Sequence, residues 1–112
     1  GIVLDMVGDR DLELPIEPGS QQRAPALVER LWATARRRGH AQFVDRARPV
    51  GVIDDHVFLA EAGVPSALII DRDYAAWHTR DDTIEHVSAQ SLAAVGDTVL
   101  YTLVELAAAP AD

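Results

Sequence analysis

Hydrophobic residues fall into two patterns along this chain: short branched runs, and longer segments in which they recur every three or four positions. The short runs predict strands at residues 2–7 and 66–70 and a short edge strand at 41–44. The helical spacing predicts helices at residues 25–38 and 56–62 and from residue 89 to about 108. Strands that alternate with helices in this way predict an α/β fold.

The ends and the buried faces of the two long helices follow from their residues. Pro25 suits the first turn of a helix, Gly39 suits its end, and Ser88 suits the N-cap of the last helix. The first long helix has one apolar face: Leu27, Val28, Leu31, Trp32 and Ala35. The last helix has a similar stripe: Leu92, Val95, Val99, Leu103 and Leu106. Both faces are expected to pack on the core.

Two long segments are predicted to lack regular structure. Residues 8–23 are polar and carry Pro15, Pro18 and Gly19, which interrupt helices and strands, so we expect a loop there. Residues 71–87 form a second irregular segment. Loops of that length inside a compact domain usually serve function.

Acidic residues and histidines gather where three apolar runs end. The first run leads into Asp5, and the second, residues 50–53, leads into Asp54-Asp55-His56. The third, residues 67–70, leads into a segment with Asp71, Asp73 and then Trp77-His78-Thr79. In open α/β sheets, ligands bind at the C-terminal ends of the strands. Because carboxylates and imidazoles together suit a divalent metal such as zinc, the sequence predicts a metal-binding edge.

Several of these side chains also have a structural explanation, and the residues alone leave the choice open. Asp5 either binds a metal or accepts hydrogen bonds from loop amides near Gly8, because a carboxylate after a buried strand needs a partner. Asp54 or Asp55 suits the N-cap of the following helix. Since one aspartate is enough for a cap, Asp55 is a candidate for holding a proton or orienting a catalytic acid. We interpret His56 as a structural histidine.

His78 is the strongest candidate for a metal ligand. It lies in the long segment after a strand, between Trp77 and Thr79, and Asp81-Asp82 follows it. Neutral imidazole is a common zinc ligand. The sequence contains no HExxH, GxSxG, P-loop or GxGxxG motif, and its serines lack the setting of a nucleophile, which disfavours a serine hydrolase.

Composition and charge exclude some classes of function. The 112 residues carry a net charge of −8, which disfavours a nucleic-acid partner. The one basic run, Arg36-Arg37-Arg38, is expected at the end of a helix, where cations complement the helix dipole. No membrane span is expected, because Asp97 and Glu105 interrupt the apolar last helix. Without cysteine there is neither a disulfide nor a thiolate zinc site, and the compartment stays undecided.

Read together, the motifs resemble the M28 metallopeptidase family, which includes zinc aminopeptidases and the animal-type glutaminyl cyclases. The resemblance lies in Leu4-Asp5-Met6-Val7-Gly8, Ile53-Asp54-Asp55-His56, Ala62-Gly63-Val64-Pro65 and Trp77-His78-Thr79-Arg80-Asp81-Asp82, in this order. Each motif is weak alone, but four in order are specific. The resemblance implies a three-layer α/β/α sandwich around a mixed, mostly parallel sheet, and makes a periplasmic or secreted protein an expectation.

The same resemblance implies roles for individual residues, with zinc as the cofactor, as one ion or two. Asp5 matches an aspartate that binds the second zinc in two-metal aminopeptidases and belongs to an acidic hydrogen-bond network in the one-zinc cyclases. His78 matches the last zinc-binding histidine. Asp55 matches an acid that supports the catalytic network. Trp77 matches a substrate-pocket residue beside the zinc, and tryptophan there resembles the cyclase branch.

One part of the family pattern has no match in this chain. The other zinc ligands and a Glu-Glu pair that holds the general base lie upstream of the Asp5 motif in the family. We therefore expect residues 1–112 to be the C-terminal portion of one catalytic domain, inactive by itself, with the N-terminal half or another copy of the chain as its partner. The expected substrate is a peptide N-terminus, with aminopeptidase-like hydrolysis ahead of cyclisation of N-terminal glutamine. A non-catalytic binding module on the same scaffold is the third alternative.

Overall fold

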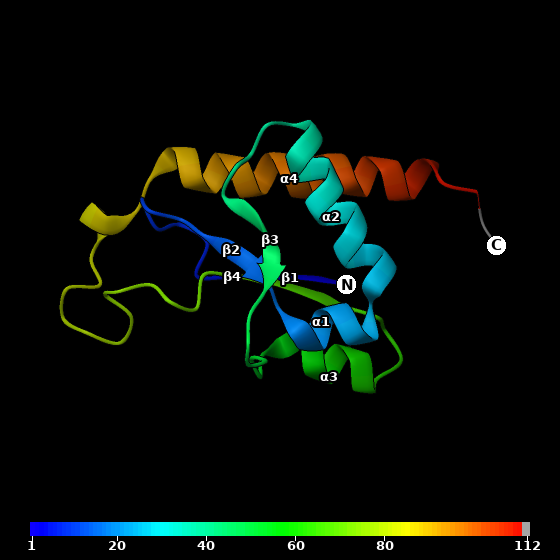
Figure 1. Ribbon diagram of the computed structural model, residues 1–112, viewed down its shortest axis with the longest axis horizontal. Helices are drawn as coiled ribbons and strands as arrows, with labels where there is room; N and C mark the ends of the chain where they lie inside the picture. Colours follow the sequence, from blue (N-terminus) through cyan, green and yellow to red (C-terminus); the bar gives the residue numbers. More distant parts are fainter. Residues whose placement is uncertain (111–112) are drawn as a thin grey trace.

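The strands form two parallel pairs in the computed structural model, which describes residues 1–110 (Figure 1). Strand β1 (Ile2–Asp5) pairs with β4 (Ala67–Ile70), in a register that runs from Ile2 opposite Ala67 to Asp5 opposite Ile70. Strand β2 (Leu14–Ile16) pairs with β3 (Phe43–Ala47) and also lies against β4. Within the described residues, β1 has β4 as its one strand neighbour.

Four α-helices surround the strands. They are α1 (Pro18–Arg23), α2 (Pro25–Arg37), α3 (Asp55–Glu61) and α4 (Ala89–Ala108), and a short 3-10 helix, η1 (Ile84–His86), precedes α4. Helix α4 runs along one side of the strands, and α1 and α3 lie on the opposite side (Figure 1). This layered arrangement of helices and parallel strands confirms the predicted α/β fold.

The predicted helix ends are confirmed by backbone geometry. Pro25 occupies the first turn of α2, and Gly39 follows that helix with a φ of 78°, which glycine adopts without strain. The Asp54 side chain caps α3 by accepting a hydrogen bond from the Asp55 amide at 2.7 Å. The Ser88 side chain accepts from the Ser91 amide at the start of α4.

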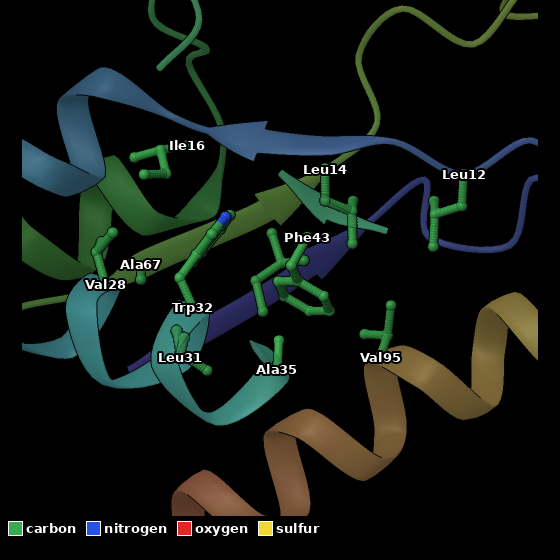
Figure 2. Close-up of a cluster of buried hydrophobic side chains, with 11 residues drawn as sticks. Leu12, Leu14, Ile16, Val28, Leu31, Trp32, Ala35, Phe43, Ala67 and Val95 are labelled. Atoms are coloured by element: carbon green, nitrogen blue, oxygen red, sulfur yellow. The ribbon is translucent and has the colours of Figure 1, made fainter. Parts of the chain in front are cut away.

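The core lies between α2 and the strands, as Figure 2 shows. Its members come from the segment before β2 and from β2, α2, β3, β4 and α4: Leu12, Leu14, Ile16, Val28, Leu31, Trp32, Ala35, Phe43, Ala67, Ile69 and Val95. The Trp32 and Phe43 rings pack edge to face with centroids 5.2 Å apart. The Trp32 indole donates to the Val44 carbonyl at 3.0 Å, so its polar group is satisfied despite its burial. The predicted inner face of this helix is confirmed, with Leu27 partly buried.

The prediction of a loop over residues 8–23 is wrong, because this segment contains β2 and α1. Pro15 lacks an amide hydrogen, and the pairing of β2 with β3 shifts register at this point between Leu14 and Ile16. Pro18 starts α1 instead of breaking a helix, and the Glu17 side chain caps that helix. The remaining part of the segment, residues 8–13, is irregular as expected.

The predicted inward stripe of α4 is also largely wrong. Its buried residues are small or polar: Ser91, Ala94, Val95, Thr98 and Thr102. Leu92, Leu103 and Leu106 are 40–49% exposed. The Thr98 and Thr102 hydroxyls donate to carbonyls four residues earlier, at 2.8 Å each, so they are satisfied inside the helix. Through this face α4 packs against α2.

Ion pairs join one end of α2 to α4. Arg37 pairs with Glu105, and the Arg38 guanidinium makes two hydrogen bonds of 3.0 Å to Asp97. The basic run therefore contacts acidic residues of α4.

Within residues 1–110, α4 alone has the length and apolar composition that a membrane crossing needs, and core helices of soluble domains meet the same criteria.

The second apolar run, residues 50–53, is not a strand. Val50 is 69% exposed and Ile53 is 84% exposed. The run is an irregular segment between β3 and α3. Of the three apolar runs that lead into acidic residues, only the first and the third therefore end as strands. The segment still brings Asp54 to the edge of β1, as described next.

Candidate functional site

Three of the four predicted site residues line one cavity at the C-terminal end of β1. The cavity has a volume of about 330 Å³, and its wall includes Asp5, Trp77 and His78. The other lining residues come from the loop after β1 and from the segment after β4: Met6, Gly8, Asp9, Tyr74, Asp82 and Val87. The sheet therefore brings together residues that are more than 70 positions apart in the sequence.

Asp5 is placed at the edge of the sheet because β1 ends with it. The next residue, Met6, has a φ of 53°, in the left-handed region that turns the chain away from the strand. The Met6 carbonyl accepts a hydrogen bond from the Asp71 amide at 3.3 Å, which ties the end of β1 to the end of β4. Non-glycine residues with such backbone angles are uncommon and are concentrated at functional sites.

Trp77 and His78 lie in tight turns of the long segment that follows β4, at the left of Figure 1. The Trp77 and His78 rings are stacked, with centroids 3.8 Å apart and an interplanar angle of 17°. The Arg72 guanidinium lies over the Trp77 ring at 3.7 Å. His78 has a φ of 56°, and the Thr79 hydroxyl and amide both donate to the Ala76 carbonyl, which hold this turn. The His78 side chain is exposed towards the cavity, while Trp77 is half-buried.

The acid beside Asp5 is Asp54, whereas the sequence interpretation chose Asp55. Partial burial of the Asp5 carboxyl group raises its pKa above the ordinary value of 3.8, and a hydrogen bond with the Asp54 carboxyl group and the negative charge of that group raise it further. Each of two neighbouring carboxyl groups disfavours the ionised form of the other. Asp54 is half-buried, and it also caps α3.

Asp55 lies away from the cavity. Its side chain is exposed, and it lines a separate hollow with apolar residues of β1 and α3: Ile2, Val3, Phe58 and Leu59. Its charge affects Asp5 less than that of Asp54 does. The structure therefore brings Asp5, Trp77 and His78 together and leaves Asp55 outside the group.

His56 and Glu17 form a buried pair behind Asp54. Both side chains are 1% exposed, and His56 Nε2 lies 3.2 Å from Glu17 Oε2. Burial by itself would raise the pKa of Glu17, but hydrogen bonds from the Ser20 hydroxyl and from the Val52, Ser20 and Gly19 amides outweigh burial and lower it below 4.5. The interpretation of His56 as structural agrees with this burial. Sequence reasoning missed Glu17, because it stands in the segment expected to be a loop.

Asp71 and Asp73 line a second cavity rather than the one with His78. This cavity has a volume of about 450 Å³ and includes Arg46 and His86 in its wall. The Asp71 carboxylate accepts a hydrogen bond from the Glu13 amide at 3.2 Å, and burial raises the pKa of Asp71. Asp71 thus holds the start of β2 against the end of β4.

The residues of the His78 cavity fit part of a zinc site. A carboxylate and an imidazole, from Asp5 and His78, face the same space, and both are usual zinc ligands. Within residues 1–110, no group of three or more potential ligand side chains is arranged to hold a metal. A catalytic zinc normally has three protein ligands, so the two on this chain would form part of the set.

Comparison with known proteins identifies similar sequences and structures. The profile of peptidase family M28 matches residues 1–103. The glutaminyl cyclase of Tannerella forsythia is 35% identical with a TM-score of 0.83, and the alignment covers 91% of this chain and 38% of that one. The glutaminyl cyclase of Fimbriiglobus ruber is 36% identical with a TM-score of 0.86, covering 90% and 34%. A Zn-dependent exopeptidase from Parabacteroides distasonis is 32% identical with a TM-score of 0.83, covering 92% and 38%.

The chain therefore spans between a third and two fifths of the length of these solved relatives. A comparison with curated proteins gives no match.

Proposed function

The chain belongs to peptidase family M28, and from this premise we propose that it forms the zinc- and substrate-contacting C-terminal part of an enzyme that cyclises glutamine at peptide N-termini. The fold and the family resemblance support an enzyme that acts at peptide N-termini. Aminopeptidase-like hydrolysis is the second candidate, since a Zn-dependent exopeptidase is among the similar structures.

The observation that carries the proposal is the carboxyl pair of Asp5 and Asp54 beside the stacked Trp77 and His78. Burial and the neighbouring Asp54 carboxyl group raise the pKa of Asp5 above its ordinary value. Cyclisation is put ahead of the hydrolysis that the sequence interpretation preferred because Trp77, where tryptophan resembles the cyclase branch, lines the cavity and because glutaminyl cyclases are among the similar structures.

The cyclisation needs proton transfer and no water nucleophile. The α-amino nitrogen of N-terminal glutamine attacks the side-chain amide carbon, a C–N bond forms, and ammonia leaves. One proton must leave the amine, and one must reach the departing nitrogen. Asp5, whose carboxyl group contacts that of Asp54, lines the cavity and is placed to exchange these protons, and the Trp77 ring provides an apolar wall for the substrate side chain.

Zinc bound by His78, with Asp5 close by, would polarise the amide carbonyl that is attacked. The remaining ligands and the general base would come from the part of the family fold that this chain does not span. We propose that this part also covers the exposed apolar surface along β1 and α3, where Leu4 is 45% exposed and Phe58 is 62% exposed. An exposed surface of this kind is typical of an interface.

The test of function compares products. The complete catalytic domain is incubated with a peptide that begins with glutamine and with one that begins with leucine, and free ammonia and free amino acid are measured. Ammonia from the glutamine peptide, with a loss of 17 mass units that reflects the departing ammonia, is expected. Free leucine without ammonia would support the exopeptidase instead. The absence of both products would support a binding module.

The test of the interface measures mass in solution. Light scattering is expected to show a one-to-one complex when this chain is mixed with the remaining part of the domain. The chain alone is measured as the reference. A homodimer of this chain that the second part does not dissociate would assign the surface to another copy.

A further inference from the structure

The Glu17 carboxylate makes more contacts than the cap of α1 requires. It accepts hydrogen bonds from the Gly19 amide at 3.0 Å and from the Ser20 amide and hydroxyl at 2.6 Å each, which complete the cap. It also accepts from the Val52 amide at 3.1 Å and lies 3.2 Å from His56 Nε2. The last two contacts reach a different part of the chain, more than 30 positions later.

These two contacts lie on either side of Asp54. Val52 precedes Asp54 by two residues, and His56 follows it by two. The segment before Asp54 is irregular, and Ile53 between the tethered amide and Asp54 is 84% exposed, so little packing holds it. Among the described residues, the last backbone hydrogen bond before Asp54 that reaches another segment runs from the Arg48 amide to the Ile16 carbonyl. The Glu17 carboxylate is thus a tether for the segment that carries Asp54.

The close approach of this segment to Glu17 depends on glycine. A Cβ atom added to Gly51 would lie 3.1 Å from Glu17 Oε1, tighter than ordinary van der Waals contact. A Cβ atom added to Gly19 would lie 3.0 Å from the same oxygen. Two glycines therefore flank one buried carboxylate, and both leave the space in which it accepts backbone amides.

We propose that Glu17 is a positioning residue, which holds Asp54 against Asp5 through the Val52 amide and the His56 ring. The proposal rests on the proposed function, in which the Asp5–Asp54 pair handles the proton. Because a carboxylate can only accept hydrogen bonds, it fixes the proton of His56 on Nε2 and orients the ring. Glu17 does not line the His78 cavity and so acts through Asp54.

The first experiment replaces the carboxylate by an amide of the same size. In the complete catalytic domain, Glu17→Gln places an amide group among donors and is expected to lower kcat by about tenfold with KM changed by less than about threefold. The same substitution in an Asp54→Asn background is expected to have almost no further effect, because the two residues act as a unit. Thr102→Val, which removes a buried hydroxyl of α4, serves as the control and is expected to leave kcat unchanged.

A second variant covers the case in which Glu17→Gln does not fold. Gly51→Ala crowds the carboxylate without changing any charge and is expected to lower kcat in the same non-additive way. Its matched control is Gly96→Ala in α4, where an added Cβ atom meets nothing within 4 Å. An unchanged kcat in folded Glu17→Gln and Gly51→Ala would overturn the proposal. So would a fall in kcat that is equally large in the wild-type and Asp54→Asn backgrounds.

Amide hydrogen exchange separates this inference from the proposed function, because it needs no turnover. The Val52 amide donates to Glu17, and the Asp55 amide donates to Asp54, so both are expected to exchange at least about tenfold faster in Glu17→Gln than in wild type. Unchanged exchange at these amides would refute the tether even in an active enzyme. Faster exchange in a protein that makes neither product would support the tether while the proposed function fails.

Discussion

Two leucine-to-alanine substitutions on neighbouring helices should differ in their effect on stability. Leu31 in α2 is 0% exposed and lies in the centre of the core, whereas Leu103 in α4 is 49% exposed. Fully buried Leu→Ala substitutions cost about 2–5 kcal/mol, because they lose transfer free energy and leave a cavity, and we expect about 3 kcal/mol for Leu31. For Leu103, about half of the side chain is already in water, and we expect a cost of about 1 kcal/mol.

Thermal unfolding followed by circular dichroism measures the difference. In a chain of this size, 1 kcal/mol changes Tm by roughly 4 °C or somewhat more, so Leu31→Ala should lower Tm by about 12 °C and Leu103→Ala by about 4 °C. Urea unfolding should give the same order with unchanged slopes. The experiment should be done on this chain and on the complete catalytic domain.

A Leu103→Ala substitution that costs as much as Leu31→Ala would refute this reasoning. It would mean that another surface covers the leucine face of α4. If the large cost appears in the complete domain and not in this chain, the covering surface belongs to the rest of the domain. If it appears in both, and falls on dilution, a second copy covers the face.

The other predictions concern the site and the acid stability. His78→Ala should remove most bound zinc together with activity, measured by elemental mass spectrometry after dialysis, and unchanged zinc would contradict its assignment as a ligand. Asp54→Asn should lower turnover more than Asp55→Asn does, with zinc retained in both; a larger loss for Asp55→Asn would restore the sequence interpretation. Hydrogen bonds, chiefly from Arg38, lower the pKa of Asp97 from 3.8 to about 2. The contribution of Asp97 to the free energy of unfolding is therefore complete above pH 4 and is lost as the pH falls through about 2. The free energy of unfolding of Asp97→Asn, measured over the same pH range, should not show this loss.

The elements that the sequence predicted well have strong local signals. Helix α2 has proline at its first turn, glycine after its end and a clear period, and its inner face was predicted correctly. Strand β2 was missed because three residues are too few for a period and Pro15 is typical of loops. The inward face of α4 was missed because its buried residues are small or polar, with threonine hydroxyls that are satisfied inside the helix, while its leucines stay exposed.

The site was predictable to the extent that strand ends define it. Asp5 ends β1, Trp77 and His78 lie in the segment after β4, and the parallel pairing of β1 and β4 brings them to one cavity. Neighbouring residues at a helix start point in directions about 100° apart, so the sequence could not tell which of Asp54 and Asp55 faces Asp5. Glu17 gave no signal, because its role depends on the distant residues that fold around it.

The stack of Arg72, Trp77 and His78 gives the cavity its own optical probe. The chain has two tryptophans, and only Trp77 touches a candidate ligand, while Trp32 is buried in the core and donates to a backbone carbonyl. Because the His78 ring is stacked on the Trp77 indole, binding of a metal at His78 should change the fluorescence of Trp77 while that of Trp32 stays constant. In a Trp32→Phe protein Trp77 is the one tryptophan, so this change in fluorescence could be measured without a second tryptophan signal, a label or a substrate.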